Sequence, residues 1–146
     1  MIKSKSMKHI CQSESDTEKL ARQMAANARA PHAYCLSGDL GAGKTAFARA
    51  FIRELCGSET NVPSPTFTLV QTYGTGKGPL WHFDLYRLER PDDVLELGWD
   101  EALADGLVLV EWPEKAGPYL PPSRTDIHIA AAPDQSRILT VTTHDR

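Results

Sequence analysis

The sequence predicts a three-layer α/β domain with a mixed, mostly parallel sheet and a C-terminal β-hairpin, and three observations support this. Short, continuously apolar runs such as residues 33–36 and 107–110 are typical of strands that are buried on both faces. Stretches with apolar residues at helical spacing lie between such runs, as expected of helices that cover a sheet. Two alternating segments near the end, residues 126–131 and 137–143, are joined by a polar turn and predict the closing hairpin.

Length and composition predict one domain that has neither a surface for coating nucleic acid nor a membrane-spanning segment. The 146 residues carry 16 basic and 19 acidic side chains, a formal net charge of −3, which argues against a protein that coats nucleic acid by itself. No uninterrupted apolar run exceeds four residues, whereas a membrane span needs roughly 18. The three cysteines are odd in number and lack metal-ligand spacing, which indicates reduced thiols in a cytoplasmic protein. We expect residues 1–9 to form a flexible polar leader and residues 10–146 to form the single domain.

The first half of the chain predicts a helix, a strand and a second helix. Ser15 and Glu18 form a capping-box pair that predicts a helix start, and Pro31 ends that segment. The apolar run over 33–36 predicts a buried strand. Apolar residues at helical spacing then predict a helix that ends at Gly57.

The second half predicts strands over 67–73 and 80–85, joined by a glycine-rich turn. Pro91 stands at a first helical position and opens a short helix that ends at Gly98. The strand over 107–110 follows and precedes the hairpin.

Residues 38–45 fit the phosphate-loop pattern G-x-x-x-x-G-K-[ST] and lie between a predicted strand and a predicted helix, the context that the motif requires. Glycines let the backbone approach phosphate oxygens closely, and the free amides of the helix start form an anion cradle. We expect Lys44 to reach the β- and γ-phosphates and the Thr45 hydroxyl to coordinate Mg²⁺. The motif therefore predicts a P-loop NTPase-like domain whose nucleotide-binding residues are Gly38, Asp39, Leu40, Gly41, Ala42, Gly43, Lys44 and Thr45.

Two acidic residues at predicted strand ends are candidates for holding Mg²⁺ or orienting water. Glu111 directly follows the run over 107–110, and Asp84 ends a strand in which His82 interrupts the apolar pattern. Each acid taken alone could be a solvated strand-terminal residue, but both near one phosphate loop predict a two-carboxylate site. For His82, a strand histidine satisfied by a neighbour is favoured over a metal ligand, because no Cys or His lies at ligand spacing.

Three further residues have two interpretations each. Thr66 lies with Ser64 in a proline-stiffened segment, and it either senses the γ-phosphate or is a turn residue that bonds its own backbone. Arg87 either neutralises transition-state charge or forms a surface salt bridge. Trp112 is either a partner-binding anchor or core packing beneath the phosphate loop.

The loop alone leaves several classes of function open. None of the seven lysines belongs to an [NT]-K-x-D element, which disfavours a GTPase. A small-molecule kinase is the main alternative to an ATPase, although the turn over 74–79 leaves little chain for a substrate lid. The third class is a nucleotide-binding interaction module with negligible turnover.

Five motifs follow one another along the chain. They are the phosphate loop at 38–45, Ser64-Pro65-Thr66-Phe67, His82-Phe83-Asp84-Leu85-Tyr86-Arg87-Leu88, Leu97-Gly98 and Val110-Glu111-Trp112. In these motifs, their order and their spacing, the chain resembles the TsaE (YjeE) family, the small ATPase of the bacterial machinery that makes threonylcarbamoyladenosine in tRNA. The resemblance covers about residues 12–143.

This resemblance implies an ATP- and Mg²⁺-dependent hydrolase that is slow alone and is stimulated by a TsaD-type transferase and its TsaB-type paralogue. Those partners transfer the threonylcarbamoyl group to N6 of adenosine 37, and ATP hydrolysis resets their complex. Contact with tRNA is then expected mainly through the complex.

The resemblance also implies roles for single residues. Lys44, Asp84 and Glu111 become catalytic residues, with Thr45 and Glu111 at the metal and Asp84 orienting water. The remaining implied roles are a nucleotide sensor at Thr66 and functional or partner contacts at Arg87 and Trp112.

Overall fold

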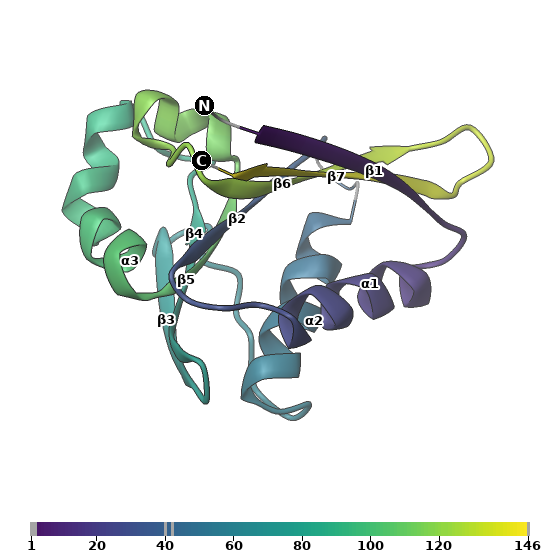
Figure 1. The fold of residues 1–146 in the computed structure, drawn as a ribbon, viewed down its shortest axis with the longest axis horizontal. Helices are drawn as coiled ribbons and strands as arrows, with labels where there is room; N and C mark the ends of the chain where they lie inside the picture. The colour runs from purple at the N-terminus through teal and green to yellow at the C-terminus, as the bar shows by residue number, and fades with distance from the viewer. Residues whose placement is uncertain (1–2, 40, 42, 146) are drawn as a thin grey trace.

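One mixed sheet organises the chain (Figure 1). The computed structural model describes residues 3–39, 41 and 43–145, and within them seven strands follow the order β1-β7-β6-β2-β5-β4-β3. The strands are β1 (Lys3–Cys11), β2 (His32–Ser37), β3 (Val70–Thr75), β4 (Gly78–Asp84), β5 (Leu107–Glu111), β6 (Arg124–Ala131) and β7 (Arg137–Asp145). The helices are α1 (Glu14–Ala26), α2 (Lys44–Cys56) and α3 (Trp99–Asp105), with the 3₁₀ helices η1 (Pro91–Leu97) and η2 (Pro113–Tyr119).

Parallel strands form the centre of the sheet, and antiparallel strands form its two sides. β2 pairs in parallel with β5 and β6, and β4 pairs in parallel with β5. The β1–β7, β6–β7 and β3–β4 pairs are antiparallel. The predicted mixed sheet and C-terminal hairpin are therefore confirmed. Because parallel strands end at the same edge, the carboxyl ends of β2, β4 and β5 lie close together.

Helices cover both faces of the sheet, as the predicted three layers require. On one face, α1 and α2 enclose a core that includes Phe47, Phe51 and Leu109, all fully buried. On the other face, η1, α3 and η2 enclose a second core around Phe83 and Trp99. Within the described ranges, none of the helices is both long and apolar enough to cross a membrane.

The N-terminal segment differs from the expected flexible leader over residues 1–9. Residues 3–9 belong to β1, which pairs with β7 from Lys3 opposite Asp145 to Cys11 opposite Arg137. Most side chains of residues 4–10 are exposed, so apolar alternation does not reveal this strand. Backbone hydrogen bonds to the opposite end of the chain hold it instead, and no local pattern encodes them.

Two other elements differ from the expectations. β3 begins later than predicted, at Val70, because residues 65–69 form turns and Leu69 adopts a left-handed φ of 69°. The helix predicted from Pro91 forms as a 3₁₀ helix. α3 follows Gly98 and was missed, since seven residues are too few to give a clear helical period.

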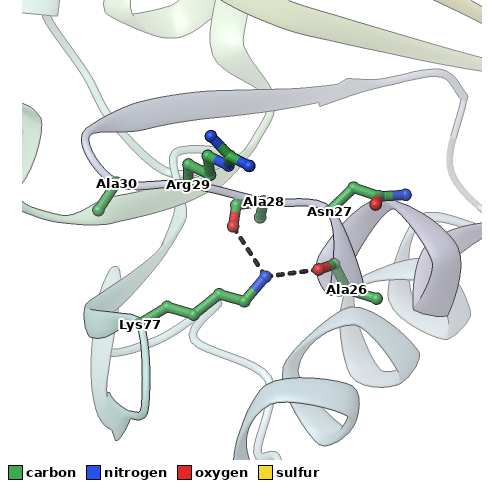
Figure 2. Close-up of a pocket in the computed structure, with 6 residues that line it drawn as sticks. All are labelled: Ala26, Asn27, Ala28, Arg29, Ala30 and Lys77. Atoms are coloured by element: carbon green, nitrogen blue, oxygen red, sulfur yellow. Dashed lines mark hydrogen bonds between the residues drawn. The ribbon is translucent and has the colours of Figure 1, made fainter.

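The side chain of Lys77 connects the tip of the β3–β4 hairpin to the end of α1 by hydrogen bonds (Figure 2). Lys77 Nζ donates hydrogen bonds to the carbonyls of Ala25 at 3.2 Å, Ala26 at 2.6 Å and Ala28 at 2.8 Å. Carbonyls at a helix C-terminus lack intrahelical partners and carry partial negative charge, so an ammonium group stabilises them. Lys77 also lines the hollow drawn in Figure 2, together with residues 26–30.

Candidate nucleotide-binding site

The phosphate loop connects the end of β2 to the start of α2. Gly38 has φ 138°, and a side chain there would collide with the backbone carbonyl of Ile129 on β6. Gly43 is the N-cap of α2 in a left-handed conformation, with φ 112°. The predicted binding residues Leu40 and Ala42 lie outside the described residues. The loop therefore requires glycine where it bends, and it leads directly into a helix N-terminus that favours anions.

Lys44 is the first residue of α2 and is only 6% exposed. Its Nζ donates to the carbonyls of Gly38 and Asp39, the latter at 3.5 Å, and lies 3.8 Å from the centroid of the Trp112 ring. Burial lowers the pKa of Lys44 below the usual lysine value. That pKa shift is opposed by surrounding acidic groups, which are Glu111, Glu114, Asp84 and Asp39. A partly desolvated cation at the positive end of a helix is a favourable partner for a phosphate group.

Asp84 and Glu111 end β4 and β5 and are directly paired in the sheet. Residues paired in parallel strands point to the same face, so both carboxylates lie on the face that α2 covers. Each residue is 6% exposed, and both act electrostatically on Lys44. The structure thus brings together the loop lysine and both acids that the sequence singled out.

Asp84 holds the proline-stiffened segment against the site. The Thr66 hydroxyl donates to Asp84 Oδ2 at 2.9 Å, and the backbone amide of Tyr86 donates to Asp84 Oδ1 at 3.1 Å. Ser64 Oγ lies 2.7 Å from Thr66 Oγ1. The Thr66 hydroxyl therefore contacts Ser64 within the turn and also reaches an acid of the site, while its role as a γ-phosphate sensor stays a prediction.

Glu111 has a different partner, the buried histidine of β4. His82 Nε2 lies 2.8 Å from Glu111 Oε2, and His82 is 2% exposed. The expectation that a neighbour satisfies this histidine is confirmed for one ring nitrogen. The other, Nδ1, is buried without a hydrogen-bond partner among the described residues. His82 and Glu111 line a small hollow together with Thr45 and Ser64.

Trp112 and Arg87 lie near the site, but their side chains make different contacts. Trp112 is half-buried in a left-handed conformation with φ 58°, and its ring contacts both Lys44 and the ring of Tyr86, at 5.0 Å. Arg87 is exposed, and its guanidinium lies 4.4 Å from the ring centroid of Phe67, which is 79% exposed. Trp112 thus touches the loop lysine, whereas Arg87 stacks on an exposed aromatic ring.

A hollow that the sequence did not predict opens on the other side of the phosphate loop. Its lining includes the N-cap Ser13 and Thr17 of α1, Gly43 of the loop, and Gln135 and Arg137 of the β6–β7 hairpin. The pairing of β1 with β7 brings these segments together, and no motif in the sequence signals it. The hairpin strands at this hollow lie on one side of β2 in the sheet, whereas β5 and β4, which end in the two acids, lie on the other.

The oxygen atoms near the loop fit Mg²⁺. The hydroxyl of Thr45 and the carboxylates of Asp84 and Glu111 are hard donors of the kind that Mg²⁺ prefers. No cluster of three or more His, Cys, Asp or Glu side chains able to hold a metal occurs in the part of the chain that the structure describes. Mg²⁺ often takes only one or two protein ligands and completes its shell with phosphates and water. The donor set therefore suits a cation that arrives with a nucleotide.

Comparisons with known proteins identify the family of the chain. The family model described as threonylcarbamoyl adenosine biosynthesis protein TsaE matches residues 11–139. The protein named tRNA threonylcarbamoyladenosine biosynthesis protein TsaE from Rickettsia felis is 40% identical over 92% of this chain and 79% of its own length. The protein of the same name from Bacillus subtilis is 41% identical over 87% of this chain and 79% of its own length. The crystal structure of YdiB from Bacillus subtilis superposes with a TM-score of 0.77 at 34% identity and covers 98% of this chain and 87% of that one. With the fold, the loop and these matches in agreement, the chain belongs to the TsaE family.

Proposed function

We propose that this protein binds ATP with Mg²⁺ and hydrolyses it as the ATPase subunit of the machinery that makes threonylcarbamoyladenosine at A37 of tRNA. The observation that carries the proposal is the convergence of the phosphate loop, Lys44 and two paired acids at one edge of the sheet. The names of the relatives, all of them for tRNA threonylcarbamoyladenosine biosynthesis, support the pathway.

Binding begins at the loop. The backbone amides from Gly38 to Thr45 and the N-terminus of α2 bind the phosphates. Lys44 exchanges its backbone carbonyl partners for β- and γ-phosphate oxygens, which are better acceptors for its charge. The Trp112 ring limits where the ammonium can move during this exchange.

Hydrolysis needs a metal-holding group and a water-orienting group. Thr45 and Glu111, which line one hollow, hold Mg²⁺ directly or through water. Bound Mg²⁺ neutralises charge on the phosphate oxygens. Asp84 orients the attacking water. Its hydrogen bond with Thr66 lets the segment over 62–66 close above the γ-phosphate and report on it.

A small-molecule kinase is the alternative, and the hairpin argues against it. β3 ends at Thr75 and β4 begins at Gly78, so the connection is too short to carry a substrate lid. The proposed partners are a TsaD-type transferase and its TsaB-type paralogue, with tRNA bound mainly through them. The cytoplasm is the compartment expected for that assembly. The candidates for partner contact are the exposed Phe67 with Arg87 stacked on it, and Trp112.

Release of inorganic phosphate, measured with and without the partner pair, tests the proposal. We expect slow release alone, faster release with the pair, and none above background for Lys44→Ala. Phosphoryl transfer to a small molecule would favour the kinase, and tight nucleotide binding without turnover in the full assembly would favour an interaction module. Wild-type release by Lys44→Ala would contradict the proposed site.

The roles of the two acids are tested by Mg²⁺ titration. Glu111→Gln is expected to raise the Mg²⁺ concentration needed for half-maximal release, because it weakens a metal ligand. Asp84→Asn is expected to lower the maximal rate with an unchanged Mg²⁺ requirement. Equal behaviour of the two variants would reject this division.

A further inference from the structure

His82 occupies a position in β4 where packing alone favours an apolar side chain. Leu80, two residues earlier on the same face of the strand, is fully buried in the core beneath α1 and α2. His82 is 2% exposed, and its Nδ1 has no partner among the described residues. A buried polar atom without a hydrogen bond is costly, so this histidine is not explained by its contribution to folding.

The contact that His82 does make is with Glu111. The Nε2–Oε2 distance is 2.8 Å, and both side chains are buried at a shared hollow that Thr45 also lines. In the described part of the chain, no other side-chain hydrogen bond reaches the Glu111 carboxylate. His82 and Glu111 lie on two neighbouring strands of the sheet, which hold their backbones in fixed positions. The hydrogen bond from the imidazole therefore restricts rotation of the Glu111 carboxylate.

We propose that His82 is a positioning residue that donates Nε2–H to Glu111 Oε2 and so leaves Oε1 oriented toward the Mg²⁺ that accompanies the nucleotide. The inference rests on the proposed function, since it assigns a role to Glu111 as a metal-holding group. Outer partners of metal ligands fix the ligand's orientation, and their loss typically costs about 10- to 100-fold in metal affinity.

Three substitutions separate orientation from packing. His82→Gln keeps an N–H donor the same number of bonds from the backbone as Nε2. His82→Asn moves the donor to the place of Nδ1, and His82→Leu removes it. The measurement is Mn²⁺ titration of the protein–ADP complex, followed by electron paramagnetic resonance, with ADP binding in EDTA as the metal-free control.

We expect His82→Leu and His82→Asn to weaken Mn²⁺ binding about tenfold and His82→Gln about threefold or less, with metal-free ADP binding unchanged in all three. In the Glu111→Gln background, His82→Leu should add less than a twofold change, because the group it orients no longer binds metal. Should His82→Leu fail to give a cooperative melting curve, His82→Asn supplies the loss-of-donor comparison.

Two results would overturn the inference. One is wild-type Mn²⁺ affinity in the folded variants that lack the donor, and the other is an equal loss in His82→Gln and His82→Asn. If the wild-type protein binds neither ADP nor Mn²⁺–ADP, the proposed function itself fails. If the wild type binds both and the variants match it, only the role of His82 fails.

Discussion

Among the residues that the structure describes, the side chains of two lysines bond to backbone carbonyls, and they do so at opposite ends of helices. Lys77 reaches three carbonyls at the C-terminal end of α1, where a positive charge is favoured. Lys44 bonds the carbonyls of Gly38 and Asp39 while it begins α2, where the helix dipole favours negative charge.

The difference teaches that similar hydrogen bonds serve different purposes. The three N–H donors of the Lys77 ammonium are all bonded within the fold, and the C-terminal end of a helix stabilises their positive charge. Lys44 is buried at an unfavourable helix end with a lowered pKa, so an arriving anion improves its environment. The first contact therefore stabilises the fold, and under the proposed function the second holds the Lys44 ammonium in place for an incoming phosphate.

Lys44→Met should have the largest effect of the variants, and the property that it changes should be ATP binding. We expect ATP affinity to drop at least about 100-fold, because charge-assisted hydrogen bonds to phosphate are worth roughly 1.5–3 kcal/mol each. Isothermal titration calorimetry measures this loss. The melting temperature of the nucleotide-free protein should not fall, and a marked drop would show that Lys44 supports the fold as Lys77 does.

Lys77→Met is the matched variant, and we expect it to lower stability while leaving ATP affinity nearly unchanged. It keeps the aliphatic stem but removes three donors from the end of α1, so we expect stability to fall by about 2 kcal/mol. For a domain of this size that corresponds to a melting temperature lower by roughly 4–8 °C, which calorimetry detects. ATP affinity should stay within about twofold of the wild type; a loss comparable to that of Lys44→Met would break the comparison.

Trp112→Leu tests the contact between the Lys44 ammonium and the indole ring, and its effect on ATP affinity should be smaller than that of Lys44→Met. Its ring lies under the ammonium, and a cation–π contact at a partly exposed site is worth roughly 0.5–1 kcal/mol. We expect ATP affinity to weaken about two- to fivefold, while Trp112→Phe keeps most of it. An equal loss in both variants would mean that the ring's charge distribution is not what matters.

The smallest expected effect is a pH dependence of stability that comes from Lys44. The folded-state pKa of Lys44 is lowered by burial, so the unfolded chain binds more protons between that pKa and the usual lysine value. Stability of the nucleotide-free protein should therefore rise as pH increases through this window, relative to Lys44→Met. Denaturant melts at alkaline pH measure the difference, and parallel curves for the two proteins would disprove it.

The sequence predicted the site better than it predicted the sheet edge. Residues 38–45 form a local motif whose backbone demands are read directly from glycine and lysine positions, and Asp84 and Glu111 stand at recognisable strand ends. β1 was missed because its contacts are with the other end of the chain. The role of Lys77 was missed for the same reason, since a lysine in a glycine-rich turn does not reveal that a helix end lies opposite.

The register of β4 against β5 has a consequence for how this site can vary. Asp84 and Glu111 face each other across adjacent strands, whose backbones are about 4.8 Å apart in any sheet. The main chain thus sets the interval between the two acids, and loop movements cannot adjust it. Side-chain length remains the adjustable quantity: a one-carbon change at either position, Asp84→Glu or Glu111→Asp, would shift a carboxylate relative to the phosphates while the sheet stays as it is.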